Sequence, residues 1–85
     1  MRIEVYQPDN SFASYCVEIS VNNQYVGKVG PGGIFSFDCE AHQADVELAC
    51  GTAFHKKTVV DRDSRVIIQW IPQTAEMELL VKSLD

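Results

Sequence analysis

Two pairs of cysteine and histidine are the residues of this sequence whose types and spacing could do chemistry. Cys39 lies three residues before His42, and Cys50 lies five residues before His55. Two thiolates and two imidazoles form a ligand set that can bind zinc tetrahedrally. The alternating segment 43–50 separates the two pairs, however, and as an extended strand it would hold them roughly 23 Å apart, at about 3.3 Å per residue. Because zinc ligands all lie about 2.0 to 2.3 Å from one ion, the sequence predicts no metal site and no cofactor.

A thiol beside an imidazole could also be a catalytic nucleophile with its base, and Cys39 with His42 is the only such pair close in sequence. Alternation places Cys39 on the strand face that carries Phe35 and Phe37, which is the face expected to point into the core. A thiol in apolar surroundings has a raised pKa and reacts slowly. We therefore predict no catalytic residue and no enzymatic activity.

Two further segments begin like ligand-binding loops but do not complete the pattern. Segment 27–33 is rich in glycine and contains Lys28. A phosphate-binding P-loop places its Lys after the glycines at the start of a helix, whereas here a strand pattern follows. Asp61 and Asp63 begin like a calcium loop, but the required Gly is absent and Pro72 stands where a bidentate Glu belongs. Both segments are interpreted as turns.

Three aromatic residues, Tyr6, Tyr25 and Trp70, could form a platform on which a sugar ring stacks. Trp70 is in register with Val66 and Ile68, and this alternation favours a position in the core for its side chain. A small carbohydrate-binding or ligand-binding domain that uses these aromatic side chains is therefore the alternative prediction of function.

Charge and composition argue against several classes of partner. Seven Lys and Arg against twelve Asp and Glu give a net charge of -5, the wrong sign for nucleic acid or an anionic membrane. The sequence contains no run of 18 apolar residues, and its first residues do not resemble a signal peptide. Three cysteines leave at least one thiol free in any disulfide scheme. We expect a cytoplasmic protein that binds neither nucleic acid nor membrane.

Short β-strands are the elements that must position these residues. Apolar and polar residues alternate along eight segments, and turn sequences separate the segments at the spacing of a sandwich or small barrel. The segments are 2–7, 12–21, 25–29, 34–39, 43–50, 54–60, 65–71 and 76–84. Segment 54–60 contains two lysines and is expected at a sheet edge. Segment 76–84 also contains good helix formers, so a helix is the alternative there. The prediction is one all-β domain over residues 1–85, a small antiparallel β-sandwich of about seven or eight strands.

About a third of the chain, residues 17–48, carries a distinctive order of strands and turns. An apolar strand is followed by the Asn22-Asn23 turn, a short strand containing Val26-Gly27, the turn at 30–33, and His42 before another strand. This order resembles the PEGA-type bacterial β-sandwich modules. The resemblance implies an immunoglobulin-like or transthyretin-like sandwich that serves as a binding or spacer module, with no active-site residues. It also implies a location outside the cytoplasm or attachment to a larger protein.

The C-terminal hairpin is apolar on more than one face. Side chains alternate between the two faces along segment 65–71, and this alternation points Ile67 and Ile71 away from the core. Leu80 and Leu84 of the next strand lie on the same outward face. The apolar area that these side chains expose together could exceed the few hundred Å² of contiguous apolar surface that monomers usually expose. A two-fold dimer would bury this face, and the alternative is that the first strand or the segment around Phe12 covers it. The sequence therefore predicts a non-enzymatic interaction module that binds itself or another protein.

Overall fold

The structure is a computed structural model of the 85-residue chain, and it describes all residues except 10–15, 52–53, 72, 75 and 85. Every helix or strand assigned in the described part is a β-strand, which confirms the all-β prediction. The strands are β1 (Arg2–Tyr6), β2 (Val17–Val21), β3 (Gln24–Val29), β4 (Ile34–Asp38), β5 (Ala44–Cys50), β6 (Phe54–Val60), β7 (Ser64–Ile71) and β8 (Glu76–Ser83). Each of the eight predicted segments overlaps one of them, although β3 and β7 begin one residue before the predicted segment. The prediction for 12–15 lies outside the described residues.

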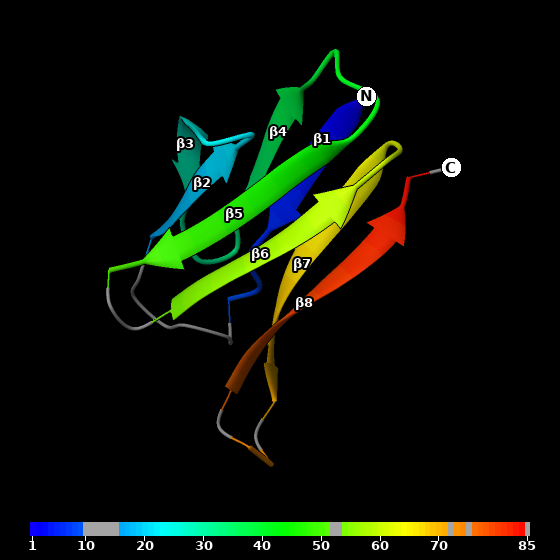
Figure 1. The fold of residues 1–85 in the computed structure, drawn as a ribbon. Helices are drawn as coiled ribbons and strands as arrows, with labels where there is room; N and C mark the ends of the chain where they lie inside the picture. Colours follow the sequence, from blue (N-terminus) through cyan, green and yellow to red (C-terminus); the bar gives the residue numbers. More distant parts are fainter. Residues whose placement is uncertain (10–15, 52–53, 72, 75, 85) are drawn as a thin grey trace.

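The strands form two four-stranded sheets that pack against each other (Figure 1). Sheet 1 has the order β4-β1-β7-β8, and sheet 2 has the order β3-β2-β5-β6. The segment after β4 therefore carries the chain from sheet 1 to sheet 2, and the turn after β6 carries it back. β6 lies at the edge of sheet 2, as its lysines predict. The segment 76–84, for which a helix was the alternative, forms the edge strand β8.

The prediction of an antiparallel sandwich is wrong at one place, because β1 and β7 run parallel in the centre of sheet 1. Ile3 lies beside Ser64, and Tyr6 lies beside Ile67. Hairpin neighbours are antiparallel because a tight turn reverses the chain. β1 and β7 are joined instead through five other strands, so no turn sequence determines their relative direction.

The hairpin between β2 and β3 turns at the residues that its sequence indicates. Asn22 and Asn23 have φ values of 51° and 66°, the left-handed conformation that a two-residue type I′ turn requires and that Asn tolerates. The N–H of Asn22 donates to the carbonyl of Asp45 at 2.9 Å, and the N–H of Asp45 donates to Oδ1 of Asn22 at 2.9 Å. These two bonds hold the turn against the start of β5.

The core lies between the sheets and is made of aliphatic side chains from both. The largest almost completely buried side chains of the described residues include Ile3 of β1, Ile19 of β2, Leu48 of β5 and Ile68 of β7. Phe35 and Phe37 of β4 are half-buried and pack against this core, on the face that alternation predicts. The alternation of the strands therefore determines which side chains fill the core.

Candidate interaction face

The structure places the two Cys-His pairs at opposite ends of β5, as the strand assignment predicts. Cys39 and His42 precede β5, and His42 is exposed in the turn before it. Cys50 is the last residue of β5, and its side chain is buried. Over residues 1–9, 16–51 and the later described ranges, no three His, Cys, Asp or Glu side chains gather as metal ligands would. The three thiols are free, and that of Cys16 is exposed.

The structure does not bring Tyr6 and Tyr25 of the predicted aromatic platform together, because they lie on different sheets. Tyr6 is in β1, in the centre of sheet 1, and alternates with the buried Ile3 and Val5, so it points to the outside of that sheet. Tyr25 is in β3, at the edge of sheet 2, and is 58% exposed. The side chain of Trp70 lies outside what the structure describes. Tyr6 and Tyr25 therefore cannot stack against the same ligand.

The outer face of sheet 1 instead carries a row of four apolar side chains, one from each strand. The ladder places Tyr6 beside Ile34 of β4 and beside Ile67 of β7, and it places Ile67 beside Leu80 of β8. All four alternate with side chains that point inward, so they share the outer face. We call Ile34, Tyr6, Ile67 and Leu80 the apolar row.

The two ends of the apolar row are exposed to solvent. Ile34 is 52% exposed and Leu80 is 39% exposed, while Tyr6 and Ile67 between them are half-buried. Ile67 and Leu80 were predicted as interface residues, and Tyr6 was predicted as a ligand-stacking residue. Ile34 was not predicted, because only the cross-strand register brings it to this face.

The other two predicted interface residues lie away from the apolar row. Ile71 is at the end of β7, beyond Ile67, which is the last β7 residue that pairs with β1. Figure 1 shows this end of the β7–β8 hairpin extending beyond the rest of the sandwich. Leu84 follows β8, and its N–H donates to the carbonyl of Asp63 at 2.9 Å. Both side chains are half-buried.

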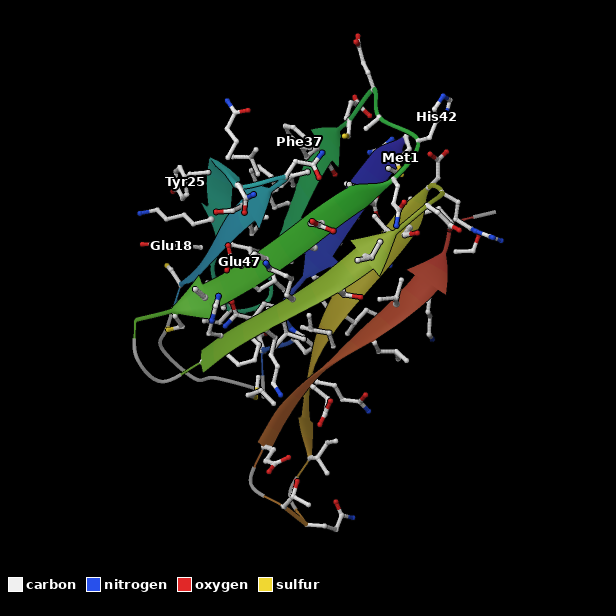
Figure 2. The ribbon with its side chains drawn as sticks, viewed as in Figure 1. Met1, Glu18, Tyr25, Phe37, His42 and Glu47 are labelled. Carbon is white, nitrogen blue, oxygen red and sulfur yellow. The ribbon has the colours of Figure 1, made fainter. Side chains whose placement is uncertain are left out.

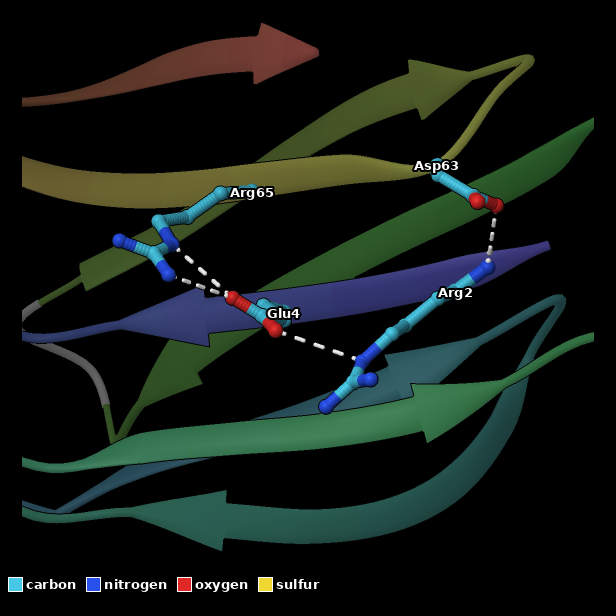
Figure 3. A network of polar contacts seen from close by, with 4 residues as sticks. All are labelled: Arg2, Glu4, Asp63 and Arg65. Atoms are coloured by element: carbon cyan, nitrogen blue, oxygen red, sulfur yellow. Dashed lines mark hydrogen bonds and ion pairs between the residues drawn. The ribbon is translucent and has the colours of Figure 1, made fainter. Parts of the chain in front are cut away.

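A charged network borders the apolar row on one side (Figure 3). Nε and Nη2 of Arg65 donate to Oε1 of Glu4 at 3.0 and 2.8 Å, and Nε of Arg2 lies 3.3 Å from Oε2 of Glu4. The backbone N–H of Arg2 donates to Oδ1 of Asp63 at 2.7 Å. The Glu4 side chain is only 12% exposed, so its hydrogen bonds with Arg65 are stronger than those of a fully solvated pair. The network ties β1 to β7 at their parallel contact.

The outer face of sheet 2 has charged side chains on its central strands, whereas the apolar row crosses the outer face of sheet 1. Glu18 of β2 lies beside Lys28 of β3, and Glu47 of β5 lies beside Lys57 of β6. Figure 2 labels Glu18 and Glu47 on the two central strands of this sheet, and Tyr25 on its edge strand. The exposed Val59 lies on the opposite edge strand, β6. Among the described residues of this face, Tyr25 and Val59 lie on opposite edge strands, and charged side chains of β2 and β5 lie between them.

His55 and Glu47 form a hydrogen-bonded pair on this charged face. The hydrogen bond from His55 lowers the pKa of Glu47, partial desolvation opposes this effect, and the charges of His55 and Lys57 lower the pKa further. A carboxyl group whose pKa is depressed by folding stabilises the fold above its unfolded pKa of about 4.3. This stabilisation is lost as the pH falls through the lower pKa of the folded state.

We therefore expect the pKa of Glu47, measured by carboxyl NMR titration, to lie below that of an unperturbed Glu. Replacing His55 by Ala removes the largest cause and should move the pKa back toward its usual value. Lys57→Ala is the control, and it should produce a smaller upward shift. An unchanged Glu47 pKa in His55→Ala would show that the pair does not form in solution.

Comparisons of the chain with protein-family models, with curated proteins and with solved structures give no match. In the part of the chain that the structure describes, no helix is long and apolar enough to span a membrane.

Proposed function

We propose that this chain is a non-enzymatic protein-interaction module that binds its partner through the outer face of sheet 1. The apolar row carries the proposal. It crosses all four strands of the sheet, and its ends, Ile34 and Leu80, are 52% and 39% exposed. Removing apolar surface from water stabilises a complex by about 25 cal/mol per Å². Because the hydrogen-bonded sheet already holds the backbone of the row in place, binding a partner would cost little conformational entropy in this part of the chain.

The contrast with the other sheet supports the choice of face. Charged side chains occupy the centre of the outer face of sheet 2, and charged residues are depleted from the cores of protein interfaces. On sheet 1 the charged network of Arg2, Glu4, Asp63 and Arg65 borders the apolar row and does not interrupt it. An apolar centre with a charged rim is the usual composition of an interface.

For the fold we propose the transthyretin-like class of sandwich over the immunoglobulin-like class. In immunoglobulin constant domains the first two strands belong to the same sheet. Here β1 belongs to sheet 1 and β2 to sheet 2, and this difference in strand order supports the choice. We also propose a cytoplasmic location, which the three free thiols support.

Site-specific photo-crosslinking in cells tests the proposed face. A photo-crosslinking amino acid placed at Leu80 or at Ile34 should give covalent adducts with a protein partner. The same amino acid placed at Tyr25 or Val59, which are at least as exposed as Leu80 but lie on sheet 2, is the matched control and should give none. Adducts from the control positions alone, or from no position, would contradict the proposal.

A further inference from the structure

We propose that the partner of this face is a second copy of the chain, and that a two-fold axis runs along the apolar row. This inference rests on the proposed function, because it names the partner of the same surface. Face-to-face packing of two identical sheets requires a two-fold axis that lies in the interface. An axis along the row would place each apolar side chain of the row over its own counterpart in the partner subunit.

The charges on β8 are self-complementary about this axis. Lys82 and Glu78 lie two residues to either side of Leu80, and alternation places all three on the outer face. A two-fold axis through Leu80 exchanges the two sides of the row. Lys82 therefore lies over Glu78 of the partner subunit, and Glu78 lies over Lys82 of the partner subunit. The dimer would gain two symmetric ion pairs across an apolar centre.

β7 follows the same arrangement. Arg65 and Gln69 lie two residues to either side of Ile67, so the axis brings Arg65 over Gln69 of the partner subunit. The guanidinium group of Arg65 already donates to Glu4, and the side chain remains 40% exposed. No pair of like charges from β7 and β8 is brought together within two residues of the row. A second copy is thus complementary to the face in charge.

The size of the face predicts a weak dimer. Four strands about 4.8 Å apart and five residues of about 3.3 Å along each strand give a flat area of roughly 300 Å². Standard interfaces bury about 800 Å² on each partner. We therefore expect a dissociation constant for the dimer on the order of 100 micromolar. The dimer would form only where the concentration of the chain is high.

A charge-reversal cycle on β8 tests the axis. The variants are Glu78→Lys, Lys82→Glu and the double variant, each studied by sedimentation equilibrium from about 10 micromolar to about 1 millimolar at low ionic strength. Each single reversal places like charges across the proposed interface and should weaken the dimer by about tenfold or more. The double variant restores opposite charges and should return the dissociation constant to near that of the wild type.

The fold of the monomer should be unaffected by these variants. In the β7–β8 ladder Glu78 lies beside the uncharged Gln69, and Lys82 lies beside Arg65. Neither single reversal therefore creates a like-charge pair within the chain, and circular dichroism of each variant should match the wild type. Leu80→Lys is a second, independent disruption, and it should abolish the dimer while the chain stays folded.

Three outcomes would overturn the inference. A wild-type chain that is monomeric at about 1 millimolar has no such dimer. If the double variant dimerises no more tightly than the single variants, the dimer does not use this axis. A dimer that survives Leu80→Lys uses another surface, such as the free edge of β8. If one of these three outcomes is found and Leu80 still crosslinks to a different protein in cells, the inference fails but the proposed function stands.

Discussion

Replacing Leu48 by Ala is expected to destabilise the fold by about 2 to 5 kcal/mol, which is the usual range for a buried Leu. Leu48 lies in the middle of β5, a central strand of sheet 2, and its side chain is 0% exposed. The substitution leaves a cavity between the two sheets. An 85-residue domain is stable by only about 5 to 10 kcal/mol, so this change should remove a large part of the total. Urea denaturation followed by tryptophan fluorescence measures the loss.

Leu80→Ala is the matched control, because it makes the same chemical change at a side chain that is 39% exposed. Measured at low micromolar concentration, where the proposed dimer is dissociated, it should destabilise the fold by less than about 1 kcal/mol. Replacing the exposed His42 by Ala should also have a small effect. Equal losses for Leu48→Ala and Leu80→Ala would show that the core does not lie between the sheets.

The strands of this protein can be predicted from the sequence because their signal is local. Alternation along Val17–Val21 and Ala44–Cys50 determines which side chains are buried, and the Asn22-Asn23 turn joins two neighbouring strands without reference to the rest of the chain. The order of the strands within the sheets, by contrast, is not encoded by any short stretch of sequence. The parallel contact of β1 with β7 joins residues about 60 positions apart, and no pattern in either segment encodes it.

The same distinction explains how much of the candidate site was predicted. Ile67 and Leu80 were found because the hairpin that carries them is continuous in sequence, and outward-facing apolar residues are visible there. Tyr6 and Ile34 join the apolar row only through pairings between strands. The network around Glu4 was missed for this reason too, since Glu4 and Arg65 are separated by 61 residues. A surface assembled across a sheet therefore needs the strand order, which alternation does not supply.

The contact between Gly27 and Phe35 is another feature that only the fold reveals. Gly27 is in β3, at the edge of sheet 2, and Phe35 is in β4, at the edge of sheet 1. A Cβ on Gly27 would lie 2.6 Å from Cζ of Phe35, and even closer to the neighbouring ring carbon Cε2. Carbon atoms in van der Waals contact lie about 3.5 to 4.0 Å apart. The two sheets thus meet at this edge because the glycine has no side chain.

Gly27→Ala is therefore expected to destabilise the fold by about 1 to 3 kcal/mol, since the Phe35 ring must move out of its half-buried position. Gly30→Ala is the control, because a Cβ there would meet only Sγ of Cys16 at 3.8 Å, an ordinary contact, and it should be nearly neutral.

A double-mutant cycle with Phe35→Ala isolates the cause of the Gly27→Ala effect. Phe35→Ala alone destabilises the fold by removing packing, but it also removes the ring with which the new Cβ would clash. The double variant should therefore be more stable than the sum of the two single effects predicts, by about 1 kcal/mol or more. Urea denaturation of all four proteins gives the coupling energy. Strictly additive losses would mean that the effect of Gly27→Ala arises within β3, and that the edges of the two sheets do not pack as the structure describes.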